Sequence, residues 1–250
     1  MINSTQIVSD FWLEISKGDI PGVSKINKFG SNKNVENDVT EDVWDGEGVY
    51  PFPTSADITH IHQVSDQAAM RGQVVEVQGL DANWDAVIQS VTLDSNDTTT
   101  LVALSTPLIR VYRAKVLANV VASEDIDITN STGTTLYARI LAGNNQTLMA
   151  IYSVPRNVTA YMTNYCCNYV RDTVKDPVGI VFKLWVADRK NGYEFQLKHE
   201  KGIPSGAPGF QHLMLPYLKI TEKSDIKITA KPDGSDAYVD AEFDLILVDN

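Results

Sequence analysis

The stretch of residues 74–93 constrains the fold of this chain more than any other segment. Two runs rich in β-branched residues flank Gly79-Leu80-Asp81-Ala82-Asn83-Trp84-Asp85, whose glycine, aspartates and asparagine tolerate the backbone conformations of a tight connection. The stretch therefore predicts a β-hairpin. Alternate strand residues face opposite sides, so Val87, Val91 and Leu93 would share one face and Ala86, Ile88, Ser90 and Thr92 the other. Because apolar residues fall on both faces, we expect this strand to lie between two layers at the centre of an all-β domain.

Length and charge narrow the class of protein. The 250 residues suffice for one large or two ordinary domains, and we expect two. No apolar run approaches the length of a membrane span, so no membrane partner is expected. The formal net charge of −11 argues against nucleic acid as a partner, because nucleic-acid affinity comes largely from Lys and Arg that neutralise phosphates.

The two cysteines, Cys166 and Cys167, are neighbours in the sequence. Neighbours on a strand point to opposite faces, so the two thiols cannot form a disulfide framework. We expect two small strand residues in a protein that assembles in a reducing compartment.

The first 37 residues predict a helix followed by an extended arm. Apolar residues of the segment 5–17 share one helical face, namely Ile7, Val8, Phe11, Trp12 and Ile15, and the turn Gly18-Asp19-Ile20-Pro21-Gly22 would end the helix. In residues 23–37 the apolar side chains recur at no clear interval. Two interpretations stand side by side: an arm that docks on a neighbouring subunit, or a helix folded back on its own domain. Under the first interpretation the partner-binding residues would be Phe11, Trp12, Ile20, Pro21, Lys25, Lys28 and Phe29.

The segment 43–53 combines three aromatic residues, Trp44, Tyr50 and Phe52, with two glycines and two prolines. This composition is typical of a tight loop that covers the open end of a sheet. A carbohydrate-stacking platform is the alternative, and buried aromatics are the more common case.

Period-2 patterns and Gly/Asn/Asp/Pro punctuation predict many further strands. They lie at 58–64, 74–79, 86–93, 101–104, 108–121, 126–130, 136–141, 147–154, 160–170, 179–187, 193–199, 211–215, 226–229 and 239–248. We expect two jelly-roll-like β-sandwich domains, at residues 38–125 and 126–250, after the helix and arm of residues 1–37. In the last strand Val239, Ala241, Phe243, Leu245 and Leu247 would form a buried face, opposite an acidic face of Asp240, Glu242 and Asp244.

The sequence carries no recognisable catalytic or metal motif. Asp81 opens a pattern of alternating oxygen side chains, but the sixth and twelfth positions of a calcium loop are Ala86 and Thr92, so a hairpin turn is expected instead. His60 and His62 share a strand face without a cysteine or acidic cluster to complete a zinc site, and we expect half-exposed strand histidines. No nucleophile elbow, phosphate loop or dinucleotide fingerprint occurs. We therefore expect no enzyme, no cofactor and no metal.

Five short motifs follow one another along nearly the whole chain. They are, in order, Ile20-Pro21-Gly22 with Lys28-Phe29-Gly30, Val43-Trp44-Asp45-Gly46, Val77-Gln78-Gly79-Leu80-Asp81-Ala82-Asn83-Trp84, Leu148-Met149-Ala150-Ile151-Tyr152-Ser153-Val154-Pro155 and Glu222-Lys223-Ser224-Asp225-Ile226-Lys227. This ordered set resembles a family of virion structural proteins of tailed bacteriophages, especially aquatic ones. The family pattern has a histidine after the glycine of the first motif, where this chain has Val23.

The resemblance implies a non-enzymatic virion component that assembles in the host cytoplasm, with other virion proteins and further copies of itself as partners. The first expectation is a capsid decoration or cement protein that binds the shell in multiple copies. The runner-up is a neck, tail or baseplate protein. A third interpretation is a glycan-binding receptor module that uses the aromatics of residues 44–52, or a glycosidase.

Overall fold

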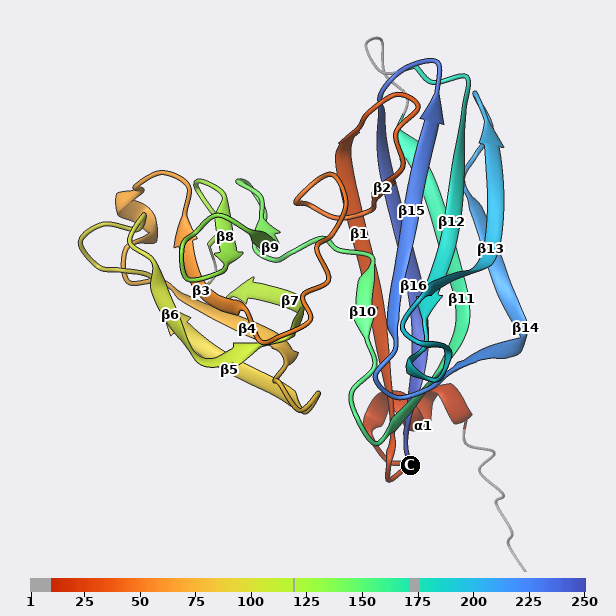
Figure 1. Cartoon of the computed structure of the whole chain (residues 1–250), viewed down its shortest axis with the longest axis horizontal. Coiled ribbons are helices and arrows are strands. Elements are labelled where there is room, and N and C mark those ends of the chain that lie inside the picture. Colours follow the sequence, from red (N-terminus) through yellow and green to blue (C-terminus); the bar gives the residue numbers. More distant parts are fainter. Residues whose placement is uncertain (1–9, 119, 171–175) are drawn as a thin grey trace, which may run out of the picture.

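The computed structural model describes residues 10–118, 120–170 and 176–250, and it confirms the expected all-β class. Antiparallel strands form two units that lie side by side (Figure 1). The larger unit contains strands β1, β2 and β10–β16, and the smaller unit contains β3–β9. Among the described residues, no helix has the length and apolar character needed to cross a membrane.

Helix α1 (Phe11–Lys17) begins after Asp10, whose side chain accepts a hydrogen bond from the Trp12 backbone N–H at 2.9 Å. It ends at Gly18, where a φ of 79° gives the left-handed conformation that glycine adopts readily. The predicted helix is thus confirmed from Phe11 onward, and Ile7 and Val8 lie outside the described residues. Ile15 is buried, whereas Phe11 and Trp12 are 52% and 46% exposed.

The larger unit is a sandwich of two sheets. One sheet has the strand order β1 (Val23–Val35), β16 (Ala237–Asp249), β11 (Val158–Val170), β14 (Phe210–Ile220). The other has the order β10 (Ile151–Ser153), β15 (Asp225–Asp233), β12 (Gly179–Ala187), β13 (Phe195–Pro204), with β2 (Glu41–Asp42) also paired to β15. A single-turn 3-10 helix (Arg189–Asn191) connects β12 to β13. Alternate apolar residues of both sheets meet in one core, which includes Tyr165, Phe182, Leu184, Phe243 and Leu245.

The smaller unit also has two sheets. Their orders are β6 (Val102–Leu108), β3 (Ile58–Gln63), β8 (Ile126–Thr129), β9 (Leu136–Ile140), and β5 (Ala86–Thr92), β4 (Val74–Leu80), β7 (Arg110–Val116). A single-turn 3-10 helix (Ala68–Met70) precedes β4. A second hydrophobic core lies between these sheets and includes Ile58, Ile61, Val75, Val77 and Leu108.

Both interpretations of residues 23–37, as a docking arm or as a folded-back helix, are wrong. This segment is strand β1, which pairs with β16 from Val23 opposite Val248 to Val35 opposite Ala237. The strand has no apolar period because its inward positions carry Lys28, Gly30 and Asn32 instead of apolar residues.

The expected domain boundary at residue 125 does not match the strand pairing. Strand β8 pairs with β3, and β9 pairs with β8, so residues 126–140 complete the smaller unit. The smaller unit is therefore an insertion between β2 and β10 of the larger unit. The composition near residue 125 gave no Pro/Gly-rich linker, because the chain stays within one sheet there.

The hairpin of residues 74–93 is confirmed as β4 and β5, but the position expected for its second strand is wrong. Strand β5 is an edge strand, and Ala86, Ile88, Ser90 and Thr92 are exposed, Ile88 to 68%. The last strand, β16, has the expected buried face at Val239, Ala241, Phe243 and Leu245. It lies between β1 and β11, in the interior of its sheet.

Candidate functional site

The contact region between the two units, called the joint below, is a continuous apolar interior. Leu80, Trp84, Ile109 and Tyr112 of the smaller unit pack in the core of the larger unit. The ring of Tyr112 meets that of Tyr152 at a centroid distance of 5.2 Å. The two units therefore share buried surface and do not merely touch through a linker.

A buried ion pair crosses the joint. Asp225 at the start of β15 accepts hydrogen bonds from Arg110 Nε at 2.8 Å and Nη2 at 2.7 Å, and from the Ser153 hydroxyl. The Arg110 and Asp225 side chains are 7% and 4% exposed. Burial opposes the guanidinium charge, but the Asp225 carboxylate outweighs it and raises the pKa of Arg110. Arg110 Nη1 also donates to the carbonyls of Pro53 and Ile109, so every edge of the guanidinium has a partner.

Aromatic rings surround this pair. The Arg110 guanidinium carbon lies 5.0 Å from the Trp84 ring centroid and 5.4 Å from that of Phe52. Tyr193 stacks on Trp84 at 6.1 Å, and these two aromatic residues both have positive φ, 64° and 68°. A hollow of about 290 Å³ opens beside the rings, and Phe195 is among its lining residues. Because the polar groups of the pair already bond to each other and to carbonyls, the arrangement holds the units together.

Lys28 lies in the joint and not on a docking surface. It is 2% exposed, and its ammonium group donates to the carbonyl of Tyr112 in the smaller unit. Burial holds the pKa of Lys28 well below its ordinary value. The expectation that Lys28 binds a partner protein is therefore wrong.

Segments that carry the phage-family resemblance meet at the joint. A Cβ atom on Gly30 would lie 2.1 Å from the Ala150 backbone N and 2.4 Å from the Val43 carbonyl, so only glycine fits there. Asp45 bonds to Leu148 twice, through its backbone N–H at 3.0 Å and its carboxylate at 2.7 Å. Burial raises the pKa of Asp45 to about 7. Three of the motifs thus contact one another where the chain leaves the larger unit after β2 and returns to it before β10.

The aromatic segment 43–53 connects β2 of the larger unit to β3 of the smaller one, and its Trp44 and Tyr50 belong to the core of the smaller unit. Trp44 and Tyr50 are each 2% exposed, and their rings meet edge to face at 5.1 Å. A sugar in solvent cannot stack on either ring. The buried-aromatic interpretation is therefore confirmed for these two residues, and Phe52 is half-buried.

The remaining residues predicted to bind a partner lie at the surface of the larger unit. Phe11, Trp12, Pro21 and Lys25 are exposed, and Ile20 and Phe29 are half-buried. Trp12 and Lys25 line a hollow of about 410 Å³ on the outer face of the sheet β1–β16–β11–β14. The Phe11 ring meets that of Trp12 at 5.7 Å, so the structure brings three of the predicted residues together and separates Lys28 from them.

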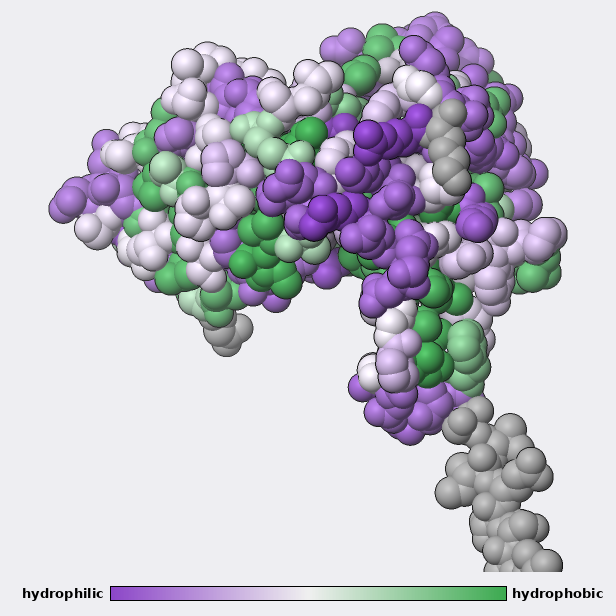
Figure 2. Space-filling view, turned by 60° about the horizontal axis from the view of Figure 1, so that its bottom comes forward, coloured by the Kyte–Doolittle hydropathy of each residue, from purple (hydrophilic) through white to green (hydrophobic). Residues whose placement is uncertain are grey.

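Strand β14 adds exposed apolar side chains that the sequence analysis missed. Leu213, Leu215 and Tyr217 are 59%, 79% and 41% exposed, and the Tyr217 ring lies 6.5 Å from that of Trp12. Together with Phe11 and Trp12 they form what we call the apolar patch. Figure 2 shows green, hydrophobic atoms at the surface of the lower part of the larger unit. The signal in the sequence was the run Leu213-Met214-Leu215-Pro216-Tyr217, which is too apolar for a strand with one exposed face.

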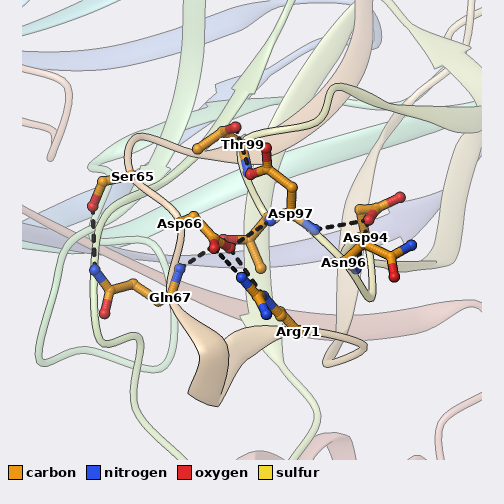
Figure 3. Close-up of polar contacts among 9 residues, drawn as sticks. Ser65, Asp66, Gln67, Arg71, Asp94, Asn96, Asp97 and Thr99 are labelled. Carbon is orange, nitrogen blue, oxygen red and sulfur yellow. Dashed lines mark hydrogen bonds and ion pairs between the residues drawn. The ribbon is translucent and has the colours of Figure 1, made fainter.

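The far end of the smaller unit is held by short polar contacts (Figure 3). Asp66, before β4, accepts hydrogen bonds from Arg71 and from the backbone N–H of Thr98 at 3.0 Å. Asp94 and Asp97 bond to backbone N–H groups two or three residues ahead. These bonds fix the two loops before β4 and β6, and the Arg71 side chain lowers the pKa of Asp66 to about 2.

The other residues considered for metal binding or catalysis lie in separate elements of the structure. Asp81 Oδ1 accepts from the backbone N–H groups of Asn83 and Asp85 at 2.7 and 3.0 Å, as in a turn. His60 and His62 are half-buried on β3, as expected. Cys166 and Cys167 are free thiols on β11, the first half-buried and the second buried. Within the described part of the chain, no group of three or more His, Cys, Asp or Glu side chains is arranged to hold a metal ion.

Fold and site together define an all-β protein of two joined units, with an apolar patch on the larger one. No protein-family model matches the sequence, and no curated protein is significantly similar to it.

Proposed function

We propose that this protein is a structural component of a bacteriophage virion, specifically a capsid decoration or cement protein that binds the shell in multiple copies. The observation that carries the proposal is the apolar patch. Three of its side chains, Phe11, Leu213 and Leu215, are more than half exposed. Exposed apolar clusters of this kind mark sites of protein association.

The joint supports this function because a particle component must hold a fixed shape. In Figure 1 the smaller unit projects from one side of the sandwich, and β14 lies at the opposite side. A protein that docks through the patch would therefore leave the smaller unit facing away from the docked surface. The Lys28–Tyr112 and Arg110–Asp225 contacts join the two units and so favour the fixed shape that this role requires.

The experiment is incorporation into particles. Trp12→Ser with Leu215→Ser should leave the protein folded, because both side chains are exposed, and should remove it from purified particles. The matched control is Ile88→Ser, which removes an apolar side chain of intermediate exposure, 68% against 46% for Trp12 and 79% for Leu215, from the smaller unit and should change nothing. Circular dichroism of each variant verifies the fold.

Quantitative mass spectrometry of the purified particles then separates the alternatives. Hundreds of copies per particle support a shell protein. A copy number that is a small multiple of three or six would instead indicate a neck, tail or baseplate protein. Absence of the wild-type protein from particles refutes the virion proposal. Equal incorporation of the patch variant and the Ile88→Ser control would show that docking uses another surface.

A further inference from the structure

A second hollow, separate from the apolar patch, lies on the outer face of the sheet β1–β16–β11–β14. Its volume is about 440 Å³, and we call it the acidic trough. Its apolar walls are Phe29, Leu148 and Phe210, and polar residues from three adjacent strands lie between them: Ser31, Cys166, Asn168, Asp240 and Glu242. The trough therefore combines apolar walls with an acidic floor.

Neither carboxylate of the trough is paired with a cation among the residues that the structure describes. Asp240 and Glu242 are two residues apart on β16 and so point to the same side of the sheet. No Lys or Arg lines the trough, and neither carboxylate forms an ion pair with any residue the structure describes. Burial raises the pKa of Asp240, as expected for a carboxylate that loses water without gaining a cation.

The next acidic residue on the same face provides a contrast. Asp244 accepts hydrogen bonds from the side-chain amides of Asn27 at 2.8 Å and Asn164 at 2.9 Å. Its charge is thus matched by donors within the sheet. Cys166, opposite Glu242, does not supply a charge, because burial and the neighbouring Glu242 raise the pKa of its thiol to about 11.

Ser31 supplies an independent observation. Its side chain is 3% exposed, and its hydroxyl oxygen forms no hydrogen bond of normal geometry within the described part of the chain. Ser31 lies directly opposite Asp240 in the β1–β16 register. The hydroxyl approaches the Asp240 carboxylate closely enough to lower the pKa of that group, but without a hydrogen bond of normal geometry. A buried hydroxyl whose bonding is incomplete costs free energy, and a ligand group in the trough would complete it.

We propose that the acidic trough binds the primary ammonium group of a lysine side chain presented by a partner protein. A lysine ammonium has three N–H donors, and the trough offers acceptor oxygens on three side chains, Ser31, Asp240 and Glu242. The aliphatic stem of the lysine packs against the apolar walls, as lysine stems do on apolar surfaces. In the assembly proposed above the partner is the shell subunit, and only that identity rests on the proposed function.

The test uses the isolated protein and a small probe. Nα-acetyl-lysine amide is titrated while backbone amide signals are followed by NMR, and the neutral Nα,Nε-diacetyl-lysine amide serves as the matched ligand. We expect saturable shifts at residues that line the trough with the charged probe alone. Shifts of equal size with the neutral probe, or shifts confined to other surfaces, would overturn the proposal.

Two variants locate the site. The double variant Asp240→Asn with Glu242→Gln should lower the affinity for the charged probe at least about tenfold, because both charge-assisted hydrogen bonds are lost. The control Glu194→Gln with Asp233→Asn makes the same change in net charge at exposed residues outside the trough and should leave binding unchanged. Equal affinity of the trough variant and its control would refute the site.

Asn168→Lys provides a variant that keeps both carboxylates. Asn168 is exposed and lies opposite Asp240 on β11, so the introduced ammonium should occupy the trough and block the probe. Unimpaired probe binding by this variant would also overturn the proposal. Because no particle enters this experiment, probe binding without incorporation into particles would refute the virion proposal alone, and incorporation without probe binding would refute the trough alone.

Discussion

Removing the Asp225 carboxylate should destabilise the protein strongly. In Asp225→Ala the Arg110 cation stays buried, at 7% exposure, and loses both bonds of its forked contact, while the Ser153 hydroxyl loses its acceptor. Breaking a buried ion pair by removing one partner typically costs about 3–5 kcal/mol. Two carbonyls and the Trp84 and Phe52 rings still stabilise the guanidinium, so the lower end applies, about 3 kcal/mol. A loss of that size raises the equilibrium constant of unfolding about a hundredfold.

Urea unfolding of the isolated protein measures this change. The matched control is Glu76→Ala, which breaks the less buried pair Lys115–Glu76, whose side chains are 42% and 19% exposed, and should cost at most about 1 kcal/mol. The double variant Arg110→Met with Asp225→Leu replaces the pair with apolar residues and should recover much of the loss.

The pair also links the unfolding of the two units. Wild-type protein should unfold in one transition because the joint is a shared core, and Asp225→Ala should separate the transition of the smaller unit from that of the larger. If Asp225→Ala costs no more than Glu76→Ala, water reaches the pair and the account of the joint given above fails.

Three further predictions follow from single residues. Arg71 lowers the pKa of Asp66 to about 2 from its ordinary 3.8, so the ionised Asp66 stabilises the fold above about pH 4. This stabilisation is lost as the pH falls from about 4 to about 2. Asp66→Asn should therefore flatten the melting temperature against pH in that window, and an unchanged profile would contradict the contact. Phe243→Ala, at a fully buried position, should cost about 3–5 kcal/mol in urea unfolding, whereas Glu242→Ala should cost about 0.5 kcal/mol or less; equal losses would mean that the register of β16 is wrong. Asp81→Ala should cost about 0.5–2 kcal/mol through the lost turn bonds, and a melting temperature that depends on calcium would instead reveal a metal site.

Local patterns predicted the strands well because alternation and turn residues are encoded within a few positions. The hairpin of β4 and β5 and the buried face of β16 both follow from such patterns. The position of a strand within its sheet does not. Ile88 is exposed because β5 is an edge strand, and nothing in residues 86–93 specifies which neighbours that strand has.

The first strand was missed because its inward residues serve the joint and not an ordinary core. Lys28 bonds to the Tyr112 carbonyl, and Gly30 leaves room for the backbone of residues 149–150. Both features depend on residues far away in the sequence. The Arg110–Asp225 pair was missed for the same reason, although a charged residue in the apolar context Leu108-Ile109-Arg110-Val111 was a usable signal for a buried ion.

The pairing of β1 with β16 governs the order in which the chain can fold. Asn27 and Asp244 bond across 217 positions of sequence, so β1 must remain unpaired until β16 has been synthesised. Strands β3–β9 are contiguous in sequence and can close during that interval. A waiting strand with apolar inward positions would pair with other nascent chains, whereas charged and amide side chains at Lys28 and Asn32 oppose such pairing. The polar residues that hid this strand from sequence analysis thus keep it free of premature association.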